Sequence, residues 1–162
     1  MTGRKTTALG AAGLLALGLA GATGGPASAA EPPRRVVVSG TVYQMDDETF
    51  GSNERCNHRM ADNDVVYYDQ QLLIDGNWSC GGEVNTQLVA FADLLPGGAV
   101  RFHGEVVLRE GTCGCMSDPI RMRKGIDQVV TRDGNVRVGT GYMQWSGGDA
   151  TEVTLQVHNR NP

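Results

Sequence analysis

The feature that most constrains this chain is the alternation of apolar and polar residues after residue 30. In the segments 84–94, 100–109, 136–143 and 153–158, apolar side chains recur at nearly every second position. A period of two is that of a β-strand with one face against a core. The pattern therefore predicts four strands. Three further segments, 36–43, 65–74 and 120–131, are rich enough in apolar and β-branched residues to predict three more.

Short turn sequences separate the predicted strands. They are Asp75-Gly76-Asn77, Pro96-Gly97-Gly98, Asp133-Gly134-Asn135 and Gly147-Gly148-Asp149. Such sequences supply the positive φ angles that connections between antiparallel strands require. About seven short strands without helical periodicity predict an all-β fold, an antiparallel β-sandwich of immunoglobulin-like or similar topology. A small barrel is the alternative.

The first thirty residues have the features of a signal peptide. Arg4 and Lys5 precede an apolar run over residues 8–22, and Ala27-Ser28-Ala29 offers the small residues of a cleavage site. We therefore expect residues 1–30 to be removed and residues 31–162 to form a single secreted, extracellular domain. The mature chain is expected to begin at Ala30 or Glu31. No other segment is apolar over the length of a bilayer span, so we expect no membrane anchor.

The charge of the chain argues against a nucleic-acid partner. There are 18 acidic and 14 basic residues, and two of the basic ones lie in the predicted signal peptide. Phosphate binding requires a cationic surface, which an acidic domain does not provide overall. We expect a monomer whose partner is an unknown protein or polysaccharide.

Four cysteines, Cys56, Cys80, Cys113 and Cys115, follow the predicted signal peptide. In an oxidising compartment an even number of cysteines predicts two disulfides. A zinc site is the alternative, although Cys-x-Cys is closer than the usual ligand spacing. A bond between Cys113 and Cys115 would close a small, strained ring. We therefore predict that these two cysteines bond outward, one to Cys80 and the other to Cys56.

Residues 45–64 are rich in carboxylates and show no alternation, so we expect a long loop there. Hard cations prefer several oxygen ligands from such a loop. The candidate calcium ligands are Asp46, Asp47, Glu48, Asp62 and Asp64. The alternative is a solvated acidic loop without a metal. We expect no other cofactor.

Catalytic motifs are absent from the sequence. The serines lack a Gly-x-Ser-x-Gly setting, and no His-Glu-x-x-His helix is present. The alternation places His103 and His158 on outward faces, whereas His58 lies among carboxylates and would suit a general base. We expect a protein without enzymatic activity, and a small secreted hydrolase with paired carboxylates is the alternative.

Candidate binding residues fall into three groups. Trp78, Trp145 and Tyr142 would form an aromatic platform for sugar rings, unless they pack in the core. The loop 113–119 would present Met116 as a protease inhibitor does. Arg121 with Arg123, and Arg101 with Arg109, share faces that would suit an anionic ligand or simply face solvent.

The loop 113–119 also resembles, in Cys115, Asp118 and Pro119, the bacterial subtilisin inhibitors, which are secreted four-cysteine β proteins. The remaining cysteine spacing differs from theirs. The sequence thus predicts a disulfide-stabilised, non-enzymatic binding or interaction module of unknown ligand. A protease inhibitor, a carbohydrate-binding module and a small hydrolase are the alternatives.

Overall fold

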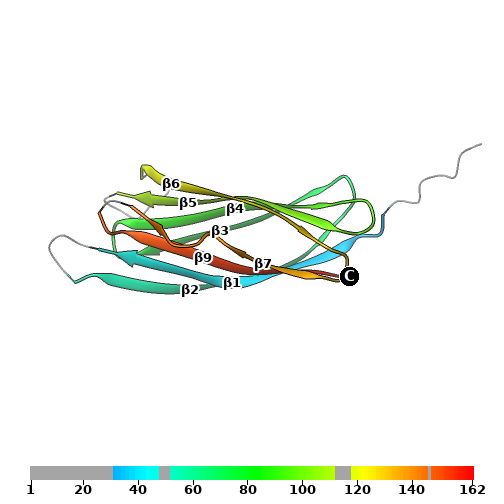
Figure 1. The fold of residues 1–162 in the computed structure, drawn as a ribbon, viewed down its shortest axis with the longest axis horizontal. Coiled ribbons are helices and arrows are strands. Elements are labelled where there is room, and N and C mark those ends of the chain that lie inside the picture. The colour runs from blue at the N-terminus through cyan, green and yellow to red at the C-terminus, as the bar shows by residue number, and fades with distance from the viewer. Residues whose placement is uncertain (1–30, 48–51, 112–117, 146) are drawn as a thin grey trace, which may run out of the picture.

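The computed structural model describes residues 31–47, 52–111, 118–145 and 147–162. These residues form nine strands and no helix, in two antiparallel sheets that pack face to face (Figure 1). The prediction of an all-β antiparallel sandwich is therefore confirmed. The expected signal peptide lies outside the described residues and stays a prediction. In the described part of the chain, no helix is long and apolar enough to cross a membrane.

Sheet A has five strands in the order β2-β1-β9-β7, with the short β8 also paired to β9. They are β1 (Arg34–Asp46), β2 (Glu54–Val66), β7 (Asn135–Gly139), β8 (Met143–Gln144) and β9 (Ala150–Arg160). Sheet B has four strands in chain order. They are β3 (Gln71–Cys80), β4 (Val84–Leu94), β5 (Val100–Glu110) and β6 (Ile120–Val130).

The chain follows an up-and-down path and crosses between the sheets twice, from β2 to β3 and from β6 to β7. These edge strands contact one another, but among the described residues no hydrogen-bonded ladder joins them. We call the two open sides the β2–β3 seam and the β6–β7 seam. Within the sandwich class, this meander differs from the Greek-key order of an immunoglobulin domain.

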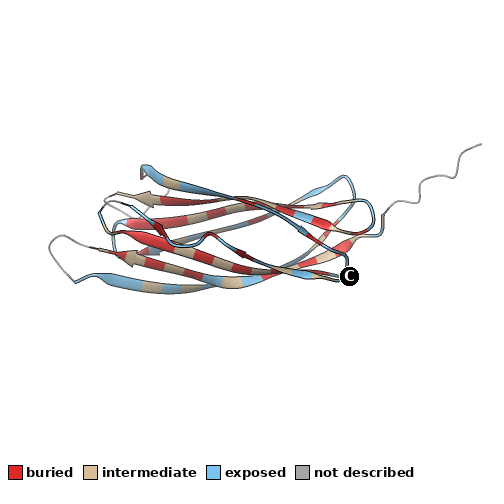
Figure 2. Cartoon of the chain, viewed as in Figure 1, coloured by how far each residue is buried: buried red, intermediate tan, exposed pale blue. Residues whose placement is uncertain are grey.

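The core lies between the sheets and is formed by the faces that the alternation predicts. All six predicted inward positions of β4, at the even residues from Val84 to Leu94, are buried. The inward side chains of β5, Val100, Phe102, Val106 and Leu108, are also buried. Figure 2 shows this alternation along β1, β4, β5 and β9, while β2 and β6 are mostly exposed. The edge strands thus cover the sides of the core and contribute little to it.

Three predicted segments have a different structure. The predicted strand 65–74 is divided between the end of β2 and the start of β3, with a turn at 67–70. The predicted turn Asp75-Gly76-Asn77 lies inside β3. Gly76 is needed for packing, because a Cβ there would lie 2.2 Å from the ring of Trp78. Likewise, β7 ends at Gly139, so Tyr142 is not on a core face.

The predicted acidic loop 45–64 is also wrong. Most of it is β2, which pairs with β1 along its whole length, from Asp46 opposite Glu54 to Arg34 opposite Val66. Backbone hydrogen bonds to β1 hold this strand, and an edge strand requires few apolar side chains. Charged side chains on an edge also discourage pairing with other chains.

The turns gather at the two ends of the elongated sandwich (Figure 1). At one end lie the connections β1–β2, β3–β4, β5–β6 and β8–β9. At the other lie the connections β2–β3, β4–β5 and β6–β7, together with the start of β1 and the end of β9. We call these the disulfide end and the arginine end, after the groups described below.

Candidate functional site

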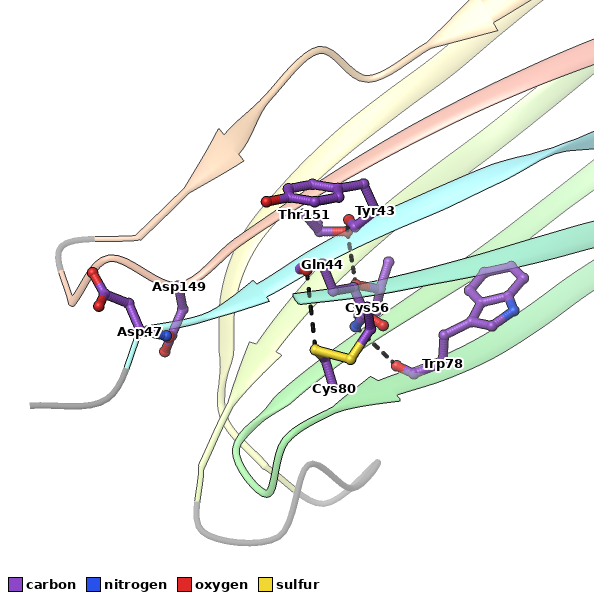
Figure 3. The surroundings of a disulfide bond; sticks show 9 residues. Tyr43, Gln44, Asp47, Cys56, Trp78, Cys80, Asp149 and Thr151 are labelled. Atoms are coloured by element: carbon purple, nitrogen blue, oxygen red, sulfur yellow. Dashed lines mark hydrogen bonds between the residues drawn. A yellow bond between two sulfur atoms is a disulfide. The ribbon is translucent and has the colours of Figure 1, made fainter. Parts of the chain in front are cut away.

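A disulfide between Cys56 and Cys80 joins the start of β2 to the end of β3 across the β2–β3 seam (Figure 3). The two Cα atoms are 5.6 Å apart. The predicted outward pairing with Cys113 and Cys115 is therefore wrong. It treated 45–64 as a loop, whereas the strand β2 at Glu54–Val66 brings Cys56 to the same end as Cys80. Cys113 and Cys115 lie outside the described residues.

Beside the disulfide, a buried chain of polar groups crosses the core. The Gln44 amide nitrogen donates to the Trp78 carbonyl at 3.1 Å and to the Thr86 hydroxyl oxygen at 2.9 Å. The hydroxyls of Thr86 and Thr151 are 2.9 Å apart, and that of Thr151 donates to the Tyr43 carbonyl at 3.0 Å (Figure 3). These bonds link both sheets beneath the disulfide, so they stabilise the fold.

The predicted aromatic platform does not form. Trp78 lies on the inner side of β3 and packs against the core. Trp145 is 36% exposed, and the Arg121 guanidinium lies 5.4 Å from the centre of its ring. Tyr142 is 51% exposed and lies near Tyr43. Met116 is outside the described residues, so the inhibitor-loop hypothesis stays a prediction.

The candidate calcium ligands are not brought together. Asp46 and Asp47 lie at the disulfide end, where the Asp47 backbone N–H donates to the Asp149 carboxylate at 2.9 Å. Asp62 and Asp64 lie opposite Val38 and Val36, toward the arginine end. Glu48 is outside the described residues. Among the residues that the structure describes, no three His, Cys, Asp or Glu side chains group closely enough to hold a metal ion.

Charges on the outer face of sheet B are paired. Arg101 donates two hydrogen bonds to the Asp127 carboxylate, at 2.9 and 2.8 Å. This hydrogen bond lowers the pKa of Asp127 and raises the pKa of Arg101. Arg123 pairs with Glu105 in the same way. One arginine of each predicted anion-binding pair is thus occupied by a carboxylate of the protein.

Two further arginines and one histidine of sheet B are held by neighbours as well. Arg121 lies 3.2 Å from the Glu110 carboxylate, and Arg109 donates to the Asp118 carbonyl at 2.9 Å. His103 faces outward, as predicted, and its Nε2 lies 2.7 Å from the Asp93 carboxylate. Little charge on this face is therefore free to attract a partner.

A shallow hollow of about 320 Å³ lies at the arginine end, between the β2–β3 and β4–β5 turns. It is lined by Tyr68, Asp69, Gln70, Gln71, Asp93, Leu94, Leu95 and Pro96. The Gln71 amide donates to Asp93 at 3.0 Å, so this carboxylate is oriented by both Gln71 and His103. The hollow offers hydrogen-bonding groups beside one exposed aromatic ring.

The outer face of sheet A is different, because its cations form no ion pairs with acidic residues in the described part of the chain. Its outward positions, as the strand registers give them, include five arginines. They are Arg35, Arg55, Arg59, Arg137 and Arg160. We call this surface the basic face. Four of the five are exposed and Arg35 is half-buried. None of the five forms an ion pair with any acidic residue that the structure describes.

Two observations sharpen this picture. Among the outward positions of these described strands the one acidic side chain is Glu152. Arg35 and Arg160 lie directly opposite each other on β1 and β9, an arrangement of like charges that is normally destabilising. The basic face was missed in the sequence because Arg55 and Arg59 lie in a segment interpreted as a loop.

At the disulfide end of the basic face lie Tyr43 and Tyr142. Partial burial of its hydroxyl raises the pKa of Tyr142, although half of the residue is exposed. The nearby Tyr43, Asp47 and Glu152 raise this pKa further, whereas Arg55 lowers it. An aromatic ring and an arginine are therefore neighbours at this edge of the face.

No protein-family model matches this sequence, and no curated protein is similar to it. A comparison with solved structures matches the chain to the secretin InvG of the Salmonella SPI-1 type III secretion injectisome, in the open gate state. The match has 7% sequence identity and a TM-score of 0.29, and covers 78% of this chain and 57% of the secretin chain. A TM-score this low supports no conclusion about fold or function.

Proposed function

We propose that this protein is a secreted, non-enzymatic extracellular binding domain that holds an anionic polymer on its basic face. The observation that carries the proposal is the set of five arginines on one sheet face without described acidic partners. Guanidinium groups bind carboxylate, sulfate and phosphate groups well, because two of their N–H donors match two oxygens of the anion.

The overall negative charge of the chain is compatible with this function. It favours binding of a polyanion at one surface only, the basic face. The whole chain has a formal charge of −4, and the arginines of sheet B are paired. An approaching polyanion is therefore attracted to sheet A. The rigid sheet also keeps the arginine backbones fixed, so little backbone entropy is lost on binding.

The experiment is retention of the purified protein on an immobilised sulfated polysaccharide over a salt gradient. A triple variant of the basic face, Arg35→Gln, Arg137→Gln and Arg160→Gln, is compared with Arg101→Gln, Arg121→Gln and Arg123→Gln on sheet B. Both variants lose three positive charges. We expect the basic-face variant to elute at clearly lower salt than the wild type, and the sheet B variant to remain close to the wild type.

Equal losses in the two variants would show that net charge alone controls retention. Failure of the wild type to bind this and other polyanions would reject the proposal. Circular dichroism and the thermal midpoint of each variant show whether it is folded, so that loss of binding is not confused with unfolding.

A second candidate function is supported by the hollow at the arginine end. Tyr68 is 43% exposed there, and the Asp93 carboxylate is held in place by two side chains. An aromatic ring beside oriented hydrogen-bonding groups suits a neutral sugar. Titration of soluble neutral oligosaccharides against wild type and Tyr68→Ala tests this function, and binding that is unchanged in Tyr68→Ala would reject this location.

A further inference from the structure

We infer that the partner of the basic face is an acidic polysaccharide whose acidic groups are separated by uncharged, hydroxyl-bearing sugars. The inference rests on the proposed function and specifies its ligand. It depends on three properties of the face: the spacing of the arginines, the residues between them, and the character of its apolar residues.

The arginines are too widely spaced for a densely charged polymer. Arg55 and Arg59 are four residues apart on β2, and Arg137 lies level with Gln156, four residues before Arg160. Four residues of a strand span about 13 Å. Arg35 and Arg160 are directly opposite each other and act as one doubly charged position. Duplex DNA, in contrast, carries one charge per about 3.4 Å of each strand.

Most of the side chains between the arginines are uncharged and can form hydrogen bonds, and the one acidic side chain is Glu152. The outward positions there include Ser39, Thr41, Asn57, Asn63, Asn135, Thr154 and Gln156. Some already bond their neighbours: Gln156 donates to Asn135 at 3.2 Å, and Arg35 donates to Asn63 at 3.3 Å. Amides and hydroxyls can both donate to and accept from sugar hydroxyls. The sequence of charged and uncharged groups therefore matches a polymer with the same alternation.

The apolar residues of the face suit a sugar ring better than a membrane. On the strands of this face, no described large apolar side chain is among the exposed ones. Tyr142, at its edge, is exposed and lies near Arg55. A flat ring next to an arginine can stack on the apolar side of a sugar while the arginine binds the acidic group of the next one. Insertion into lipid would require protruding apolar side chains instead.

The test compares four soluble probes near physiological ionic strength, about 0.15 M. Hyaluronan has one carboxylate for every second sugar, polygalacturonate has one for every sugar, and inorganic polyphosphate and duplex DNA are more densely charged. Vesicles of anionic phospholipid are a fifth probe. We expect the lowest Kd for hyaluronan, and a Kd for it at least about tenfold higher in the triple variant of Arg35, Arg137 and Arg160.

Tyr142→Ala separates stacking from charge. It should weaken hyaluronan binding by about fivefold, because ring stacking contributes to binding of the sugar. It should leave polyphosphate binding unchanged. The triple variant of Arg101, Arg121 and Arg123 on sheet B is the control matched in charge to the basic-face variant, and it should bind hyaluronan as the wild type does.

The outcomes distinguish the inference from the proposed function. Tighter binding of polygalacturonate, polyphosphate, DNA or vesicles than of hyaluronan, with loss in the basic-face variant, would overturn the inference and leave the function standing. An identical effect of Tyr142→Ala on hyaluronan and polyphosphate would also overturn it. Absence of binding to every probe would reject both.

Discussion

The two ends of the sandwich hold the two sheets together by different kinds of interaction. Both must hold together two sheets whose edges share no described hydrogen-bonded ladder. At the disulfide end, a covalent bond between Cys56 and Cys80 closes the β2–β3 seam. On the opposite side of that end, Arg121 of β6 lies over the ring of Trp145, which follows β8.

The arginine end is closed by buried hydrogen bonds instead. Arg34 is 1% exposed and its Nε donates to the Asn159 side-chain oxygen at 2.8 Å. Its other nitrogens bind Asn161 and Asp133. The Asn159 amide nitrogen is 2.8, 3.3 and 3.1 Å from the carbonyls of Gly98, Val130 and Thr131. This network joins β1 and β9 of sheet A to the turns that follow β4 and β6.

The disulfide and the buried hydrogen-bond network act on different states of the protein. A disulfide stabilises mainly by restricting the unfolded chain. A buried charge acts in the native state, and it is costly unless every partner is present. We therefore expect the arginine end to be more sensitive to single substitutions than the disulfide end.

The largest effect is expected for Asn159→Ala. The change removes the partners of three buried carbonyl groups and one hydrogen bond of a buried guanidinium. Such losses cost about 3 to 5 kcal/mol of unfolding free energy. Urea denaturation measures the loss. Gln156→Ala, on the outer face of the same strand, is the control and should change the free energy by less than about 0.5 kcal/mol. Similar values for the two variants would show that the Asn159 network is not what closes this end.

A smaller effect is expected when the disulfide is removed. Cys56→Ala combined with Cys80→Ala should lower the unfolding free energy by about 2 to 4 kcal/mol, because the bond closes a loop with a sequence separation of 24. The double variant leaves no single thiol from this pair. Peptide mapping under non-reducing conditions checks the pairing first. If the double variant were as stable as the wild type, the order proposed for the two ends would still hold, but the covalent closure would be unimportant.

A still smaller effect is expected on the other side of the disulfide end. A double-mutant cycle of Arg121→Ala and Trp145→Ala should give a coupling energy of about 0.5 to 1 kcal/mol, typical of a cation–π contact open to solvent. Glu110 also contacts Arg121, so a third variant, Glu110→Gln, measures that contribution separately. A coupling energy near zero would indicate that the disulfide alone closes this end.

The sequence predicts the central strands and the edge strand β6 well, and the other edge strands poorly. The bounds of β4 match the predicted segment 84–94, because its neighbours β3 and β5 cover its backbone and the core covers one face. A strand in this position must alternate apolar and polar side chains. The edge strand β2 need not show this alternation, because its inward positions lie beside the open seam and include His58, Asp62 and Asp64. Its existence depends on pairing with β1, which a local pattern does not contain.

The basic face was beyond local patterns for a similar reason. Its five arginines come from four strands that are distant in the sequence, and only the register of sheet A brings them to one face. Gly76 is the opposite case, in which a local pattern predicts a feature that the fold does not contain. The local sequence Asp75-Gly76-Asn77 is typical of a turn, but in the fold the glycine makes room for Trp78. In both cases a tertiary contact decides what the local sequence leaves open.

The smallest effect is expected for the exposed ion pair between Arg101 and Asp127, which contrasts with the buried arginine network. Near the arginine end, Asp127 accepts two hydrogen bonds from Arg101, and both residues are open to solvent. The hydrogen bond lowers the pKa of Asp127 in the folded protein, so the ionised carboxylate is favoured by folding. Its contribution is therefore present above the ordinary aspartate pKa and is lost as the pH falls through the lowered value.

The thermal midpoints of wild type and Asp127→Asn should differ slightly at neutral pH and converge in acid. High salt should also reduce the difference, because exposed pairs are screened. A difference that persisted in acid would mean that Asp127 contributes through packing rather than charge. In that case the contrast between a buried network and an exposed pair at the same end would need another explanation.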